Sequence, residues 1–146
     1  MPRLLALLLA LSAAGCGVLA PFDADRGDFS ATVRGAETFD LDGSAYLTLA
    51  SDLPPATSVL LTGTDEPAIE ATVAAGALRV GTYAIPTEAT ATFERSRYDG
   101  RPYVGTAGTL RVTRVGDGEA EGTLSFTAAR GGGEVTVEAT FTAEEG

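Results

Sequence analysis

From Phe29 onward, apolar and polar residues alternate along most of the chain. The segment "EVTVEATFT" puts Val135, Val137, Ala139 and Phe141 on one side and polar residues on the other; similar runs cover 29–34, 68–73, 89–94 and 123–128. A period of two is typical of a strand with one buried and one solvated face, and threonine at the polar positions favours β structure. No stretch after the N-terminal leucines has a convincing helical period. The pattern predicts an all-β chain.

Turn residues separate several of these runs. Asp99-Gly100, Asp117-Gly118 and the glycines at 131–133 lie between alternating segments, where tight hairpin turns need a positive φ. The last third is therefore predicted to be a three-stranded antiparallel meander at 106–115, 119–129 and 134–142. The prolines of "LPP" (53–55) and "IPT" (85–87) break pairing, so these segments are expected at edges or in loops.

The predicted strands number nine or ten, and they must cover a large apolar face together. A chain of 146 residues is long enough for one such domain. Short strands of this number close on one another, so we expect a single antiparallel β-sandwich or a flattened β-barrel. The sequence does not distinguish these two. With one cysteine, the domain has no internal disulfide and depends on its core.

The charge and the missing residue types restrict the function classes. The net charge is −10, which argues against nucleic acid as a partner. The chain has no histidine, so the usual Ser-His-Asp, Cys-His and zinc sites are not available. It also has no lysine for a Schiff base or a phosphate loop. We therefore predict a protein that is not an enzyme and uses no cofactor or metal.

The first sixteen residues have the three parts of a secretory signal. Arg3 gives a positive start, the run from Leu4 to Leu11 is apolar, and small residues follow up to Gly15. The apolar run is about half the length of roughly 20 residues that a membrane-spanning helix needs. We predict a signal peptide at 1–15, cleavage between Gly15 and Cys16, a flexible acidic tether at 16–28, and an all-β domain at 29–143.

The segment "SAAGC" ending at Cys16 resembles the lipobox of bacterial lipoprotein signal peptides. The resemblance implies that the Cys16 thiol carries a diacylglycerol and that the new amino terminus can take a further acyl chain such as palmitate. The membrane is then the first partner of the chain. The expected location is the cell envelope, at the outer membrane or another membrane, with the domain outside the cytoplasm. An ordinary cleaved signal peptide is the alternative.

The domain itself also has a familiar pattern. "FSATVRG" at 29–35, "GTYAIP" at 81–86 and the closing "GTLRVT…EGTLSFTA…GEVTVEATF" are similar to small bacterial envelope lipoproteins with a β-rich domain of unknown function. The resemblance implies an all-β fold in the cell envelope. It implies no catalytic or ligand-binding residues.

Asp40 and Asp42 in "FDLDGS" are the first candidate contacts for a ligand or cation. Alternation places both carboxylates on one face of a strand. We expect a solvated strand that leads into an Asp-Gly turn. Two alternatives stay open: a calcium site, because D-x-D-G is part of a calcium loop, and a carboxylate pair for glycoside chemistry.

Tyr98, Arg101 and Tyr103 around "DGRP" are the second group of candidates. We expect the two tyrosines to pair across a hairpin, with contact to a sugar or peptide as the alternative. Arg95 and Arg97 lie beside them with Arg101. These arginines either balance the acidic surface or form a site for an anion or carboxylate.

Together these features predict a membrane-anchored envelope lipoprotein that acts as a non-catalytic binding or structural module, with an envelope protein as its partner. A lipocalin-like barrel that carries a small ligand is the second hypothesis, and a cavity inside the barrel would favour it. A carboxylate-pair glycosidase is the third, and it requires two acidic side chains in a cleft.

Overall fold

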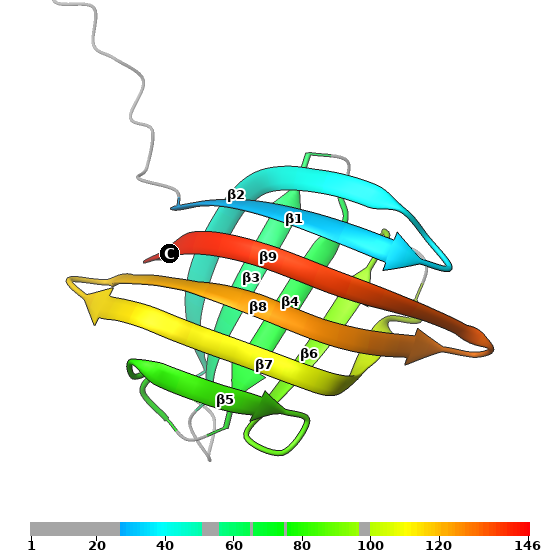
Figure 1. Cartoon of the computed structure of the whole chain (residues 1–146). Coiled ribbons are helices and arrows are strands. Elements are labelled where there is room, and N and C mark those ends of the chain that lie inside the picture. Colours follow the sequence, from blue (N-terminus) through cyan, green and yellow to red (C-terminus); the bar gives the residue numbers. More distant parts are fainter. Residues whose placement is uncertain (1–26, 51–55, 65, 75, 97–99) are drawn as a thin grey trace, which may run out of the picture.

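A computed structural model describes residues 27–50, 56–64, 66–74, 76–96 and 100–146 (Figure 1). This part of the chain forms nine strands and no helix, as predicted. The strands are β1 (Gly27–Gly35), β2 (Phe39–Ala50), β3 (Ala56–Gly63), β4 (Ala68–Val73), β5 (Gly81–Ile85), β6 (Ala89–Glu94), β7 (Tyr103–Gly116), β8 (Glu119–Arg130) and β9 (Gly133–Glu145). No helix in these ranges is long and apolar enough to cross a membrane.

Eight of the strands close into an antiparallel barrel. Around the ring the order is β1, β2, β3, β4, β6, β7, β8 and β9, and β9 pairs with β1 again. The only parallel pairing among the described strands is short and joins Tyr46 and Leu47 of β2 to the end of β9. Figure 1 shows β1, β9, β8 and β7 lying as one layer over β3, β4 and β6, while β2 curves from one layer to the other. The flattened barrel is one of the two predicted architectures.

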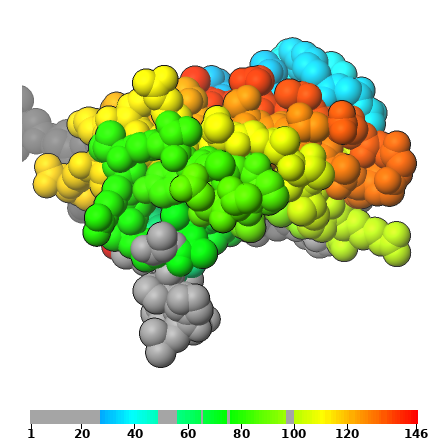
Figure 2. Space-filling view, turned by 60° about the horizontal axis from the view of Figure 1, so that its bottom comes forward, coloured from blue at the N-terminus to red at the C-terminus, as the bar shows by residue number. Residues whose placement is uncertain are grey.

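Of the nine strands, β5 is the one that lies outside the closed ring. β6 pairs with β7 only at Tyr103 and Val104, and the register of β7 then shifts between Gly105 and Ala107. Beyond that shift, residues 108–112 of β7 pair with β5. Figure 2 shows the green segment that contains β5 beside the yellow β7. β7 therefore belongs to the barrel along its whole length and also carries an added edge strand.

The interior of the barrel is filled by side chains at the apolar positions of the alternation. The largest fully buried ones include Phe93, Phe126, Leu61, Ile69, Leu110 and Leu124. β4 and β6 have the bounds that the alternation predicts, and their inward residues are buried. The first strand begins at Gly27 and the last ends at Glu145, two residues beyond each predicted limit of the domain.

Two of the predicted hairpin turns are confirmed. Asp117 and Gly118 both have positive φ angles, of 51° and 76°, and join β7 to β8 in a two-residue turn. The β8–β9 hairpin turns at Gly131 and Gly132. In contrast, the expected turn at Asp42-Gly43 is wrong, because β2 continues through Gly43, which pairs with Phe29 on one side and Gly63 on the other.

The closed ring has two ends that we name for their contents. The connections β1–β2, β3–β4, β6–β7 and β8–β9 all lie at one end, which we call the arginine end because it holds Arg34, Arg95, Arg101 and Arg130. The start of β1, the end of β9 and the β7–β8 turn lie at the other end, which we call the terminal end. The barrel strands run between these two ends.

Candidate functional site

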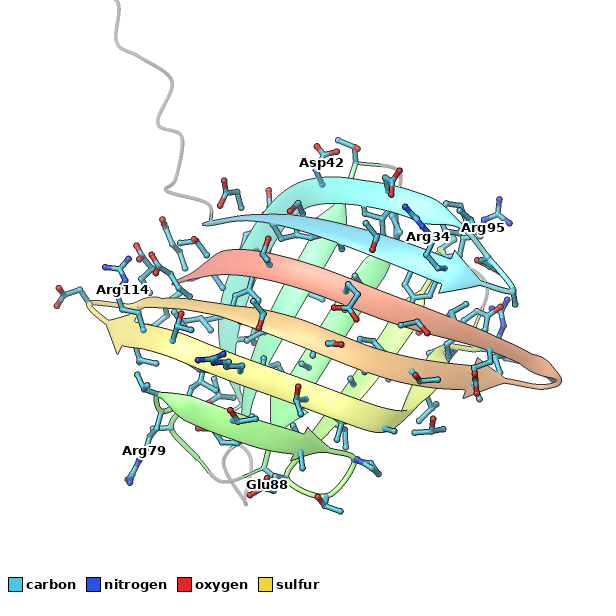
Figure 3. The ribbon with its side chains drawn as sticks, in the orientation of Figure 1. Arg34, Asp42, Arg79, Glu88, Arg95 and Arg114 are labelled. Atoms are coloured by element: carbon cyan, nitrogen blue, oxygen red, sulfur yellow. The ribbon has the colours of Figure 1, made fainter. Side chains whose placement is uncertain are left out.

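The arginine end concentrates positive side chains on an otherwise acidic protein. The chain has ten arginines and twenty acidic residues. Figure 3 shows Arg34 and Arg95 together at this end, whereas Arg114 lies at the terminal end. The same end also holds acidic residues, among them Glu37 and Asp40, so its local charge depends on which arginines they pair with.

Three aromatic rings from three strands support these arginines. The ring centroids of Phe39 and Phe93 are 6.3 Å apart, and those of Phe93 and Tyr103 are 5.9 Å apart. Phe93 is fully buried because it is an inward residue of β6, and Tyr103 faces it across the β6–β7 pairing. These distances are typical of attractive aromatic pairs, so the stack holds the rim of the barrel in one arrangement.

Arg130 is fully engaged in a cluster with Glu37 and Tyr103. Its guanidinium lies 4.3 Å from the centroid of the Tyr103 ring, Nη2 is 3.2 Å from Glu37 Oε1, and Nη1 donates to the Arg101 carbonyl at 3.0 Å. The Tyr103 hydroxyl donates to the same Glu37 oxygen at 3.3 Å. The Glu37 side chain is 15% exposed, and its Oε2 has no hydrogen-bond partner among the described residues. This cluster ties the β1–β2 turn to β7 and β8.

Arg34 is also engaged, by the first strands. Its Nη1 donates to the carbonyls of Val33 and Phe39, and its Nη2 is 2.6 Å from Asp40 Oδ1. The guanidinium therefore bridges the end of β1 and the start of β2. The ion pair neutralises Asp40, although both side chains are at least half exposed.

Arg95 differs from these two arginines. Its guanidinium lies over the Phe39 ring, 5.4 Å from the centroid, a cation–π contact. Among the described residues it has no carboxylate within ion-pair distance and no hydrogen-bond acceptor. A groove of about 360 Å³ lies beside it, lined by Phe39, Asp40, Leu41, Pro67, Arg95 and Ser96. We call this the Arg95 groove.

Asp40 and Asp42 lie on the same outer face of β2, as predicted. Asp42 faces Ser30 of β1, which in turn faces Thr140 of β9. These side chains belong to a shallow groove of about 450 Å³ whose other polar lining includes Thr32, Thr123 and Glu138. Within the described ranges, no three His, Cys, Asp or Glu side chains converge as a metal site would require. The two aspartates therefore lie on an open polar surface of the sheet.

The second group of candidates is only partly brought together. Tyr103 is 3% exposed and contributes to the core and to the Glu37–Arg130 cluster, so its ring does not face solvent. Arg101 is exposed, and its backbone carbonyl accepts from Arg130. Tyr98 lies outside the described residues. β6 and β7 are paired only as far as Phe93 and Tyr103, so the connection between them is much longer than a two-residue hairpin.

A third hollow, of about 240 Å³, lies at the terminal end. Its apolar lining comes from Leu47, Ala77, Leu78 and Val115, and Asp117, Glu119 and Glu145 also line it. Thr57 lines it as well, and its hydroxyl donates to the Gly76 carbonyl at 2.6 Å. This hollow is smaller than the usual small-molecule pocket of roughly 300–1,000 Å³.

The sequence does not indicate several residues of the arginine end. Glu37 and Arg130 are 93 positions apart in the sequence. Pro67 and Phe39 line the same groove only because β2 and β4 both have an end here. None of these residues belongs to a motif. Arg95 and Arg101 are close in the sequence, and the structure places both at the arginine end.

Comparisons with protein-family models, with curated proteins and with solved structures find no match to this chain. A fold alone does not specify a function.

Proposed function

We propose that this protein is a lipid-anchored lipoprotein of the cell envelope that acts as a non-catalytic binding module and presents its arginine end to a partner. The support for the anchor is the signal pattern that ends at Cys16. The support for a binding role is the Arg95 groove, where a cation that has no carboxylate partner among the described residues lies beside apolar side chains.

The direction of the barrel carries the proposal. Gly27, the first described residue, lies at the terminal end, opposite Ala45 of β2. β1 runs from there to Gly35, a distance of about 30 Å for a nine-residue strand. A chain anchored at Cys16 enters the domain at the terminal end, so the arginine end is the end of the barrel farther from the anchor and is accessible to an envelope protein.

The proposal is tested in the native envelope with the full-length chain. A photo-cross-linking residue replaces Glu66 next to the Arg95 groove in one variant and Asp117 at the terminal end in the other; both positions are exposed. Intact mass of the membrane-extracted protein is measured in parallel. We expect a mass increase equal to a diacylglycerol with its acyl chains on the processed chain, and cross-links to one partner from position 66 only.

Two results would contradict the proposal: the first concerns the lipid anchor and the second the binding surface. An unmodified Cys16, or retention in the membrane fraction by a Cys16→Ser variant, would show that the chain is not anchored by this lipid. A partner captured only from position 117 would place the binding surface at the terminal end instead.

A small-ligand carrier remains the second candidate, and one observation favours it. The eight-stranded barrel is the architecture of lipocalin-like carriers, and part of the lining of the hollow at the terminal end is apolar. Because the described interior is filled with side chains, the ligand would lie at this mouth and not at the centre of the barrel. Native mass spectrometry of the extracted protein tests this role, since a carrier should retain a small apolar molecule that a Leu78→Glu variant loses.

A further inference from the structure

We propose that the Arg95 groove recognises a carboxylate carried on an apolar group about the size of one amino-acid side chain. This inference rests on the proposed binding role of the arginine end and specifies the chemistry of its ligand. It is carried by the position of Arg95, by the side chains that line the groove and by the charge around it.

Arg95 is held in place and still has its donors available. The Phe39 ring supports one face of the guanidinium, and Phe39 itself packs against the buried Phe93. The N–H groups of this guanidinium have no acceptor among the described residues, so they are available to a ligand. The planar fork of an arginine matches the two oxygens of a carboxylate, which gives it two parallel hydrogen bonds.

The lining beside Arg95 suits an apolar group. Phe39 and Leu41 are partly buried and pack on the core, and Pro67 is buried. Pro67 is held by the β3–β4 turn, where the Gly63 amide donates to its carbonyl at 2.9 Å. The groove of about 360 Å³ has room for one large side chain together with a carboxylate.

The local charge favours an anion. The only acidic side chain that lines the groove is Asp40, and Arg34 is paired with it at 2.6 Å. Arg34 offsets the charge of Asp40, so Arg95 is the charged residue of the groove lining that has no ion pair among the described residues. Elsewhere, Arg130 is paired with Glu37, and Arg114 with Glu119 and Glu121. Arg79 and Arg101 are exposed and have no ion pair among the described residues, but neither lies over an aromatic ring there. Arg95 does, and the groove beside it gives a carboxylate ligand a defined place to bind.

The test uses ¹⁹F NMR with the full-length protein extracted in detergent. The first pair of probes is N-acetyl-4-fluorophenylalanine and its primary amide, which have the same apolar group and differ in the carboxylate. A second pair is a five-residue peptide ending in 4-fluorophenylalanine, with a free or an amidated C-terminus. Line broadening on titration gives the affinity of each probe.

We expect both acids to bind at least about tenfold more tightly than their amides, because a hydrogen-bonded charge pair is lost in the amide. Arg95→Gln should remove this preference. Arg79→Gln, which changes another exposed arginine without an ion pair among the described residues, should keep it. Thermal unfolding of each variant checks that it is folded.

Some outcomes identify the source of the ligand, and others decide whether the proposal holds. A peptide acid that binds more tightly than the single amino acid indicates a chain terminus, and equal affinities indicate a small free acid; both support the proposal. Equal binding of acid and amide, or no binding of any probe up to about 10 mM, overturns it. Cross-linking from position 66 to a partner in the envelope would still succeed in that case, so failure of the carboxylate site is distinguishable from failure of the proposed function.

Discussion

Tyr103 shows how one side chain of the arginine end combines structural and electrostatic contacts. Its ring packs on Phe93 and under the Arg130 guanidinium, while its hydroxyl reaches the nearly buried Glu37 carboxylate. The residue is 3% exposed, so water does not easily replace that hydrogen bond. Its role is to hold together the β1–β2 turn, β7 and β8 beside the Arg95 groove.

We expect Tyr103→Phe to lower the free energy of unfolding by about 1 kcal/mol, because it removes the hydrogen bond to the Glu37 carboxylate and the longer one from Arg130, and keeps the ring. Tyr46→Phe is the control, since the Tyr46 hydroxyl has no hydrogen bond in the described structure. Urea unfolding followed by circular dichroism measures both. Equal stability of the two variants would mean that the Tyr103 hydroxyl contributes nothing.

Gly122 of β8 is required by a close approach inside the barrel. A Cβ at this position would lie 2.9 Å from Phe141 Cζ and closer still to the Arg111 carbonyl oxygen. We expect Gly122→Ala to lower the free energy of unfolding by about 1–3 kcal/mol, because the packed core must shift to make room. The same urea measurement applies.

Gly116 of β7 is the matched control for this glycine. It is also in a strand, and a Cβ there would have no neighbour within 4 Å. Gly116→Ala should change the stability by less than about 1 kcal/mol. A loss as large as that of Gly122→Ala would show that the effect comes from strand glycines in general and not from the contact with Phe141.

At the scale of the elements, β5 is the one described strand that pairs on one side only, and Glu88 protects part of its other edge. The Ala84 amide donates to Glu88 Oε2 at 2.8 Å, and the Glu88 amide donates back to the Ala84 carbonyl at 2.8 Å. The N–H and C=O groups of Ala84 thus point away from β7, and both are paired with Glu88 in the turn that follows β5. Figure 3 shows Glu88 at this lower edge of the molecule. Such capping prevents an edge strand from pairing with another chain.

We expect Glu88→Ala to speed hydrogen exchange of the Ala84 amide by about 5- to 30-fold, because that amide loses its acceptor. Exchange measured by NMR at single residues resolves this effect. Glu134→Ala removes the same charge from an exposed glutamate on β9 and should leave Ala84 unchanged. Unchanged exchange in the Glu88 variant would contradict the protective role.

At the scale of the whole molecule, the charge is large and of one sign. The net charge is −10, and the ion pairs of Arg34 and Arg114 lie at exposed positions, where such pairs contribute little. Mutual repulsion of the carboxylates therefore opposes folding at low ionic strength.

We expect the melting temperature to rise by a few degrees between about 10 mM and about 150 mM NaCl, because salt screens this repulsion. Circular dichroism at constant pH measures the transition. An unchanged or lower melting temperature at the higher salt concentration would mean that the exposed ion pairs outweigh the repulsion.

The sequence by itself determined the class of fold and most of the strand positions. Alternation with a period of two depends only on neighbouring residues, so 68–73 and 89–94 could be assigned as strands with their inward faces. The turn at Asp117-Gly118 could also be assigned from local sequence, because aspartate and glycine tolerate the positive φ angles that the turn requires. The carboxylates of Asp40 and Asp42 were placed on one face by the same rule.

Only the tertiary structure decided which strands pair and what meets at the ends of the barrel. Closure requires β1 to pair with β9, whose paired residues are about a hundred positions apart in the sequence, and it brings Glu37 to Arg130 and Pro67 to Phe39. Asp42-Gly43 has the composition of a turn, yet Gly43 lies within β2, because pairing on both sides outweighs local preference. Alternation specifies which face is buried but not which strand lies beside it, so the Arg95 groove exists only once the ring has closed.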